Sequence, residues 1–408
     1  MDRPLDRPSS RALKGRLARK PTVPAVDSPL AWAMVVSAFF ASAVVFGVMY
    51  SFGVFLLPLA ADFRASTAGV SALFSMTTIV YYFLGAPAGR LADRYGPHAV
   101  IATGAIGIGA GLCLTASANS LWLVYLTYSI GAGLGGACCY VPTLAVVGGW
   151  FVRHRNIALG IAAAGAGSGT LAFPPVVAAL IERYGWRATF VTLGVVGGTI
   201  LLACAAVTRS PPVQPAGERT GPKVSANLCS RPFILLYLSW VLATTALFVP
   251  FVFLPAFARE HGASEIAAAS LISVIGGTSI LGRLFLGPLG NRVGVLTLFK
   301  LTVLLMGLSY AIWLLPTYWA LVAFAAVLGT SYGSRIAALP AVLIELFGTA
   351  HLGTMLGVFL TAGGLAGLIG PTLAGLAVEL SGGYTGAIAF ALAMGLLGFA
   401  VIAPLGRD

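Results

Sequence analysis

The sequence predicts an all-α membrane protein whose twelve transmembrane helices form two six-helix halves. Of the 408 residues, 58% are hydrophobic and only 9% are charged, whereas soluble domains carry about 25% charged residues. Twelve apolar segments approach or exceed the roughly 20 residues that cross a bilayer as a helix. Several features of the first half of the chain also return at one constant offset in the second half. A large soluble core is therefore excluded.

The twelve predicted spans are joined by connections that hold charged or turn-forming residues. They cover residues 31–57, 67–88, 98–117, 121–149, 157–180, 187–207, 233–257, 265–288, 295–315, 317–346, 352–378 and 384–404. Residues 1–29 are rich in Pro and Arg and lack an apolar stretch, which predicts a disordered cytoplasmic tail rather than a signal peptide. Residues 208–232, rich in Pro and basic residues, predict a cytoplasmic linker between an N-terminal half, 30–207, and a C-terminal half, 233–408.

Internal repetition supports this division. Identical residues stand 197 positions apart in the two halves: Gly160 and Gly357, Pro174 and Pro371, Glu182 and Glu379, Gly185 and Gly382. Such a repeat implies two six-span halves related by an axis along the membrane normal.

The net charge of +12 reflects membrane topology rather than a nucleic-acid partner. With both termini inside, only Arg64, Arg183, Arg187 and Arg259 of the 24 Lys and Arg residues fall outside, and only Arg283 and Arg335 lie within spans. The excess of basic residues on the cytoplasmic side predicts a multi-pass protein of a plasma membrane, of the bacterial inner-membrane type, with both termini cytoplasmic. The lipid bilayer is its expected partner.

No pattern of cysteine or histidine residues indicates a cofactor. The five cysteines lie in or beside spans without CxxC spacing, and the four histidines are scattered among loops. We therefore expect neither a metal site nor another cofactor. An enzyme would need an acid–base or metal constellation inside the membrane, and no His or acidic residue stands at a span centre.

Residues 89–98 carry the most specific motif of the chain. Gly89, Leu91, Ala92, Asp93, Arg94 and Gly96 match the pattern Gly-x-Leu-Ala-Asp-Arg-x-Gly-Arg-Arg/Lys, while Pro97 and His98 depart from it. The segment resembles the signature loop of the major facilitator superfamily, and a weaker copy covers residues 287–294, with Asn291 in the Asp position. The alternative is an ordinary basic cytoplasmic loop.

This resemblance implies the major facilitator fold and a transporter that works by alternating access. The glycines allow a tight return between two helices, and an Asp beside arginines can bridge to the end of a neighbouring helix. The residues expected to stabilise one conformation in this way are Gly89, Arg90, Asp93, Arg94 and Gly96.

Two further segments are similar to the monocarboxylate transporter and oxalate–formate antiporter branch of that superfamily. Before the first span, Asp27, Ala31 and Trp32 match part of the pattern Asp/Glu-Gly-Gly/Ser-Trp/Phe-Gly/Ala-Trp. At the entry to the fifth span the matching residues are Phe151, Arg155, Ala158, Gly160, Ala162, Ala164 and Gly165, whereas His154 replaces a Lys or Arg. The branch implies transport of a small organic anion, such as lactate, pyruvate or a dicarboxylate, with a proton or a counter-anion as coupling partner.

Arg283 and Arg335 are the strongest candidates for binding that anion. A charged side chain at mid-bilayer costs at least about 2.5–3.5 kcal/mol on insertion scales, so it is usually paired or functional. All twelve acidic residues lie in tails, loops or span ends, so no central carboxylate is available for either arginine. A substrate carboxylate can supply the missing anion through a bidentate contact. The alternatives are snorkelling of Arg283, and a carbonyl contact or a cation–π partner such as Tyr332 for Arg335.

The family resemblance implies roles for some of these residues, and other positions depart from the family pattern. Arg283 corresponds to the span-eight arginine to which carboxylate binding is attributed, but Ser279 stands where an Asp is frequent. Tyr50 stands where animal monocarboxylate transporters carry a Lys linked to proton coupling. Oxalate exchangers carry a Lys in span eleven, which is missing between residues 352 and 378; Arg335 could neutralise a second charge instead.

Tyrosines within the spans are candidate cavity-lining hydroxyls, although a tyrosine in a span is more often a packing residue. They are Tyr50, Tyr81, Tyr82, Tyr140 and Tyr332.

Two other functions compete with anion transport. Efflux of hydrophobic or drug-like compounds is the main one, although Ala172-Phe173-Pro174-Pro175 replaces the Gly-Pro-x-x-Gly-Gly element of drug–proton antiporters. A transporter-like sensor would need a signalling segment, and the tail and the linker both lack a foldable apolar pattern.

Overall fold

The computed structural model describes residues 27–211, 228–285, 287–348 and 352–406, and these residues form helices and short turns without strands. This confirms the predicted all-α membrane fold. The expectations for the tail, 1–26, and for most of the linker, 212–227, lie outside the described residues.

The helices follow the predicted spans closely. In the first half they are α1 (Pro29–Tyr50), α2 (Phe52–Phe63), α3 (Thr67–Tyr95), α4 (Pro97–Ala116), α5 (Leu121–Trp150) and α6 (Arg155–Val207). In the second half they are α8 (Arg231–Glu260), α9 (Glu265–Phe285), α10 (Gly287–Val293), α11 (Val295–Trp313), α12 (Tyr318–Phe347), α13 (Leu352–Ser381) and α14 (Thr385–Ile402).

The described helices include 11 that are long and apolar enough to cross a membrane, and α6 accounts for two spans. Its 53 residues contain one non-helical position, Gly185, with φ 79° and ψ 166°. Gly96 and Gly294, at the turns before α4 and α11, have similar angles of φ 89° and 88°. Residues with a Cβ atom disfavour positive φ, so glycine suits each of these turns. Divided at Gly185, α6 brings the total to twelve spans.

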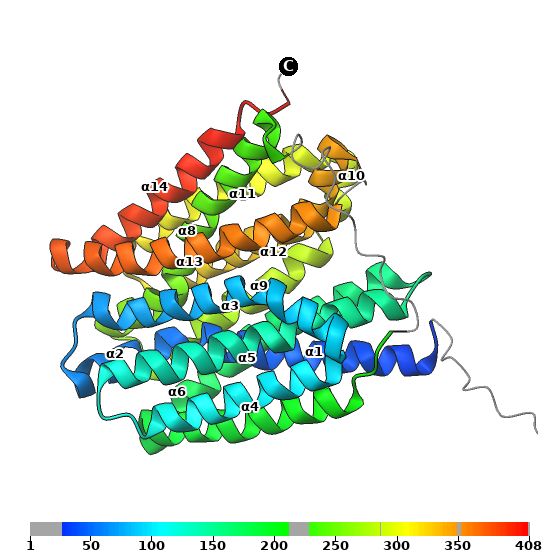
Figure 1. The fold of residues 1–408 in the computed structure, drawn as a ribbon. Helices are drawn as coiled ribbons and strands as arrows, with labels where there is room; N and C mark the ends of the chain where they lie inside the picture. The colour runs from blue at the N-terminus through cyan, green and yellow to red at the C-terminus, as the bar shows by residue number, and fades with distance from the viewer. Residues whose placement is uncertain (1–26, 212–227, 286, 349–351, 407–408) are drawn as a thin grey trace, which may run out of the picture.

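Two bundles lie side by side in Figure 1, α1 to α6 below and α8 to α14 above, and α3 and α13 run along each other where the bundles meet. Other contacts between the bundles join α6 to α9, α2 to α8 and, to a smaller extent, α2 to α9. Small residues allow these approaches: a Cβ at Gly53 of α2 would overlap the Phe251 carbonyl oxygen of α8. In lipid, where apolar burial gives little drive, such close packing and polar contacts hold helices together.

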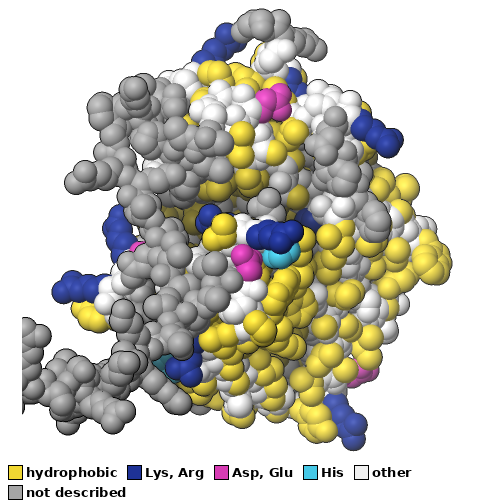
Figure 2. All heavy atoms as spheres, turned by 90° about the vertical axis from the view of Figure 1, so that its right-hand side faces the viewer, with side chains coloured by type: hydrophobic (Ala, Val, Ile, Leu, Met, Phe, Trp, Pro, Cys, Tyr) yellow, Lys and Arg dark blue, Asp and Glu magenta, His cyan; other side chains and the backbone are white. Residues whose placement is uncertain are grey.

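The two ends of the bundle differ in charge. The linker end, at the right of Figure 1, carries the start of α1 and the turns at Gly96, Phe151 and Gly294, and the far end carries the turn at Gly185. Exposed arginines of the linker end are Arg90, Arg94, Arg153, Arg155, Arg209, Arg231 and Arg292, against Asp27, Asp93 and Glu345. The far end has Arg64, Arg183, Arg187 and Arg259 against Asp62, Glu182, Glu260, Glu265 and Glu379. Figure 2, which looks onto the linker end, shows its basic side chains.

At the far end, hydrogen bonds tie the start of α3 to the end of α13. The Ala68 N–H donates to Glu379 Oε1 at 2.9 Å, and the Ser71 hydroxyl donates to the Pro371 carbonyl at 3.1 Å. Thr372 Oγ1 donates to Ser75 Oγ at 2.9 Å. These bonds close the interface between the halves on this side.

Toward the linker end, the interface helices have free space around two repeat-related glycines. A Cβ added at Gly160 of α6 or at Gly357 of α13 would meet no described atom within 4 Å. Both glycines are exposed, which contrasts with the packed start of α3. The halves are therefore held together at the far end and are less tightly packed toward the linker end.

Substitutions of two glycines on α6 test this packing. A Cβ at Gly169 would overlap the Ala43 carbonyl oxygen of α1, so we expect Gly169→Ala to destabilise the protein by about 1–3 kcal/mol through overpacking. At Gly160 the same change meets no atom and raises helix propensity, so the thermal midpoint should stay or rise. Thermal unfolding in detergent measures both, and equal midpoints for the two variants would contradict this packing.

Candidate functional site

Aromatic side chains from both halves meet near the middle of the interface. Phe46 of α1 packs against Tyr50 and against Tyr140 of α5, with ring centroids 5.4 and 4.9 Å away. Tyr50 stacks on Phe251 of α8 with 4.1 Å between the centroids and 13° between the planes. Phe251 in turn meets Tyr332 of α12 edge to face at 6.5 Å. This aromatic cluster joins the N-terminal and C-terminal halves.

Tyr81 and Tyr82 of α3 extend the same cluster. Their rings lie 4.8 Å apart, and Tyr81 is 6.4 Å from Tyr140. Tyr82 lies where a side chain at Gly363 of α13 would have to go, so it reaches across the interface. Tyr50 interacts electrostatically with Tyr82 and Tyr332. The structure therefore brings together all five tyrosines that the sequence singled out.

Arg283 lies on α9 where that helix packs on α6 of the other half. Its Nη1 donates a hydrogen bond of 2.9 Å to the Ala163 carbonyl, and its guanidinium lies 5.8 Å from the centre of the Tyr332 ring. Arg283 is half-buried, its Nε has no acceptor, and it interacts electrostatically with Tyr140. Its guanidinium therefore points into the interface and does not snorkel to the linker end.

Arg335 on α12 is almost completely buried, with 1% of its surface exposed. Its guanidinium lies 4.3 Å from the centre of the Trp240 ring of α8, and its Nη2 donates to Thr244 Oγ1 at 3.0 Å. The other two nitrogens, Nε and Nη1, are buried without an acceptor. Arg335 also interacts electrostatically with Tyr82, a residue of the opposite half.

Neither arginine is neutralised by a carboxylate among the residues that the structure describes. The ion pairs there join Asp27 to His154, Asp62 to Arg187 and Glu265 to Arg259, all at the ends of the bundle. Buried charges in proteins are normally paired, because an uncompensated ion in a low-dielectric interior is costly. Two cations with free donors at one interface are therefore suited to binding an anion.

Two details concern the alternatives to anion binding. Arg335 has a cation–π partner, as one alternative expects, but the ring is that of Trp240, and Tyr332 lies over Arg283. The carbonyl contact proposed for Arg335 belongs to Arg283. The sequence alone did not indicate Trp240 and Thr244. Aromatic and hydroxyl residues are common in spans, and the role of these two depends on how α8 packs on α12.

Comparison with known proteins identifies the family. The family model described as Major Facilitator Superfamily matches residues 38–315 and 236–407. Among curated proteins, "Monocarboxylate transporter 13" of Rattus norvegicus is 34% identical over 93% of this chain and 90% of its own length. "Monocarboxylate transporter 3" of Rattus norvegicus is 32% identical over 86% of this chain and 75% of its own length. The chain belongs to the major facilitator superfamily, in its monocarboxylate transporter branch.

Solved structures agree with the fold of this transporter. A bacterial homologue of the lysosomal transporter Spinster, in an inward-facing and occupied conformation, has a TM-score of 0.75 at 18% identity, covering 93% of this chain and 97% of that one. The peptide transporter POT in complex with sulfate has a TM-score of 0.74 at 16% identity, covering 92% of this chain and 95% of that one. These two structures share the fold. The family model and the curated monocarboxylate transporters describe transporters and not enzymes, so this chain is a transporter.

The signature segment of this transporter is mostly helix rather than loop. α3 continues through Arg90, Asp93 and Arg94, and the chain turns only at Gly96, where proline follows. The bridge that was expected from Asp93 to a neighbouring helix is absent, because Asp93 is exposed and makes no ion pair or hydrogen bond with any described residue. Arg94 lies over the ring of Tyr95 at 5.3 Å.

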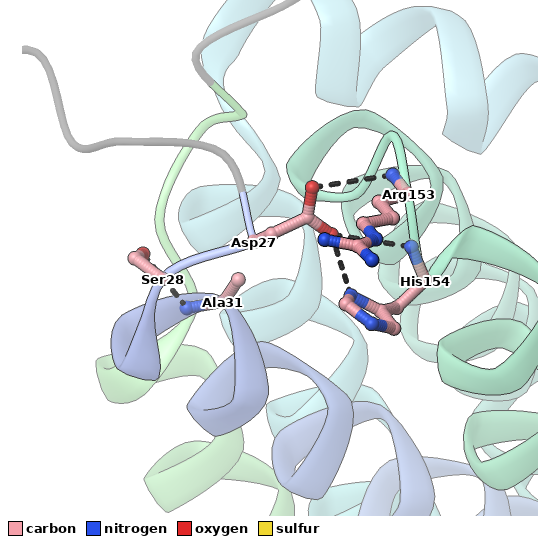
Figure 3. A network of polar contacts seen from close by, with 5 residues as sticks. All are labelled: Asp27, Ser28, Ala31, Arg153 and His154. Carbon is pink, nitrogen blue, oxygen red and sulfur yellow. Dashed lines mark hydrogen bonds and ion pairs between the residues drawn. The ribbon is translucent and has the colours of Figure 1, made fainter.

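The two segments that resemble the monocarboxylate branch meet at the linker end (Figure 3). Asp27 accepts hydrogen bonds from the backbone N–H groups of Arg153 at 3.2 Å and His154 at 3.3 Å. Its own N–H donates to the Trp150 carbonyl at 3.1 Å, and the His154 ring lies 3.5 Å from its carboxylate. Asp27 thus ties the start of α1 to the turn between α5 and α6.

Aromatic packing reinforces this contact. The ring of Trp32 meets Phe151 edge to face, with 5.1 Å between centroids, and both residues belong to the two resembling segments. Trp150 is fully buried, and its indole N–H donates to the Arg209 carbonyl at 3.2 Å. Residues that are far apart in the sequence therefore form one structural unit at the start of α6.

The carboxylate of Asp27 is favoured in its ionised form. Burial by itself would raise the pKa of this group, but the backbone N–H groups of Arg153, His154 and Val152 outweigh that effect and hold the pKa below its ordinary value. The stabilisation from this interaction is therefore present above about pH 4, the ordinary carboxyl pKa, and is lost as the pH falls through the lower folded value.

We expect Asp27→Ala to lower the thermal midpoint at neutral pH, because two backbone N–H groups lose their acceptor. The difference from wild type should persist at pH 5 and shrink as the pH falls below about 4. Asp93→Ala is the matched control, since it removes the same charge from an exposed site without a partner and should leave the midpoint unchanged. A midpoint for Asp27→Ala equal to that of wild type at neutral pH would refute the contact.

Proposed function

We propose that this transporter carries a small organic anion, either a monocarboxylate such as lactate or pyruvate or a dicarboxylate, which binds between the halves at Arg283. The observation that carries this proposal is the guanidinium of Arg283, which faces the interface without a carboxylate partner among the described residues. The names of the relatives, monocarboxylate transporters, support the same substrate class.

The chemistry of the site suits a carboxylate. A guanidinium offers parallel N–H donors that match the two oxygens of a carboxylate, and weak local screening strengthens the pair. Arg283 has an unpaired Nε and is half-buried, so a ligand can reach it, and the Ala163 carbonyl is a neutral partner that an anion can displace. Tyr332 lies with its ring centre 5.8 Å from this guanidinium and Tyr140 interacts with it electrostatically, so we propose that their hydroxyls contribute further hydrogen bonds.

Alternating access is the proposed mechanism. Bonds between α3 and α13 close the far end, whereas Gly160 and Gly357 stand in free space toward the linker end, as expected for a conformation open on that side. Rocking of one half against the other would break the far-end bonds and close the linker end. The basic linker end is assigned to the cytoplasm by the positive-inside rule, here for a plasma membrane of the bacterial inner-membrane type.

Coupling by exchange, or by a proton carried with the substrate, fits the site better than coupling through a lysine in the first span. Tyr50 stands in the place of that lysine and stacks on Phe251. The acidic residues and histidines that the structure describes lie at or near the ends of the helices, and none of them forms an ion pair with Arg283. A counter-anion can bind the same guanidinium on the return step.

Efflux of a hydrophobic or drug-like compound is the second candidate. The aromatic cluster around Phe46, Tyr50 and Phe251 favours it, because such rings offer apolar contact area. That function does not require a guanidinium, so the two candidates differ in their response to loss of Arg283.

In proteoliposomes, we expect Arg283→Gln to abolish uptake of labelled lactate and pyruvate, since the amide keeps a polar side chain but removes the charge that pairs with the carboxylate. Loss of one charge-assisted contact of about 1.5–3 kcal/mol corresponds to at least a tenfold loss of apparent affinity. Assays with and without a pH gradient, and with an internal counter-anion, separate symport from exchange.

Arg183→Gln is the control for this assay, because Arg183 is an exposed arginine of the far end and its loss should leave uptake at the wild-type level. Carboxylate uptake by Arg283→Gln at the wild-type rate would refute the proposal. Export of hydrophobic dyes that survives the same substitution would favour the efflux candidate.

A further inference from the structure

We propose that Arg335, Trp240 and Thr244 form a second anion subsite beside Arg283, so that the preferred substrate is a short dicarboxylate. This inference rests on the proposed function, in which Arg283 binds the first carboxylate. It adds to that function a second charged group on the substrate and three residues that select for it.

The first argument is the state of the Arg335 guanidinium. It is 1% exposed, and two of its three nitrogens are buried without an acceptor. A buried cation with unsatisfied donors is among the costliest groups a membrane protein can hold. A structural role in tying helices together would leave those donors bonded to carbonyls or hydroxyls of the bundle. Among the residues that the structure describes, only Thr244 fills that role.

The second argument is that the surroundings orient this cation without neutralising it. Trp240 covers one face of the guanidinium at 4.3 Å, and Thr244 accepts from Nη2 at 3.0 Å. The ionisable groups that interact with Arg335 are Tyr82, Tyr310 and Tyr332, and none of them is a carboxylate. Tyr310 donates its hydroxyl to the Ala246 carbonyl at 2.7 Å. The charge is thus held in place without a neutralising partner among the described residues.

The third argument is the position of Arg335 relative to Arg283. Tyr332 interacts with both arginines, lying over Arg283 at 5.8 Å and three residues before Arg335 on α12. Arg283 is hydrogen-bonded to the Ala163 carbonyl of α6, in the N-terminal half. Arg335 interacts electrostatically with Tyr82 of α3, in the same half. The two cations therefore approach the interface beside different helices of the opposite half.

These positions determine the ligand class. A monocarboxylate bound at Arg283 would leave the charge of Arg335 uncompensated, whereas a dianion with its carboxylates at opposite ends satisfies both guanidinium groups. Tyr332, which interacts with both arginines, can offer its hydroxyl to a hydroxyl or oxo group on the chain of such an acid. At a given chain length, the acid with two carboxylates should therefore be preferred.

The test compares acids that differ only in the second carboxylate. Wild-type transporter in proteoliposomes at about pH 7, where both carboxyl groups are ionised, is given labelled succinate or butyrate, with malonate and propionate as the shorter pair. We expect a half-saturation concentration at least about tenfold lower for each dicarboxylate. Arg335→Met, of similar bulk and uncharged, should reduce the ratio of dicarboxylate to monocarboxylate uptake at least tenfold. Arg335→Lys should restore part of that ratio.

Binding to the wild-type protein tests the subsite even if a variant at Arg335 fails to fold. Succinate should raise the thermal midpoint of the wild type in detergent more than butyrate does, and should change its tryptophan fluorescence unless Trp240 is replaced by Phe. Arg183→Gln should behave as wild type in both assays.

The outcomes separate the two proposals. Uptake of lactate or butyrate without a preference for dicarboxylates in the wild type overturns the second subsite and leaves the function of Arg283 intact. A ratio unchanged by Arg335→Met does the same. If no carboxylate binds or is carried by the wild type, both proposals are wrong.

Discussion

The arrangement of this transporter depends on two guanidinium groups that enter the membrane-spanning part of the bundle without a protein carboxylate. Their cost is only partly offset, by the Ala163 carbonyl and the Tyr332 ring for Arg283, and by the Trp240 ring and the Thr244 hydroxyl for Arg335. All these partners are neutral, so the positive charge remains and polarises the interface. In the proposed function, an anion from solution completes this electrostatic arrangement.

The interface that holds these charges combines close backbone approaches with polar bonds. Glycine lets α2 approach the backbone of α8, and the polar bonds between α3 and α13 are concentrated at the far end. Approaches of similar closeness occur within each half, as the contact between Gly169 and Ala43 illustrates. In the proposed mechanism the two halves move against each other as units.

The linker end illustrates how local sequence motifs acquire meaning from their partners. The segment around Asp27 and the segment around Phe151 each resemble the family pattern weakly when read alone, and in the structure they form one hydrogen-bonded and aromatic unit. The segment around Asp93 resembles its pattern strongly, yet its carboxylate has no partner among the described residues in this conformation. A bridge from Asp93 would belong to a conformation in which the linker end is closed.

The sequence by itself determined the membrane fold, the span count, the turns at Gly96 and Gly294 and the presence of unpaired arginines, because hydrophobic length, glycine and charge act locally along the chain. It also singled out tyrosines that do lie together. Tertiary structure alone decided which ring covers which arginine, that Thr244 accepts from Arg335 and that Asp27 reaches Arg153. These contacts join α8 to α12 and α1 to the α5–α6 turn, and helix periodicity carries no information about which faces of different helices meet.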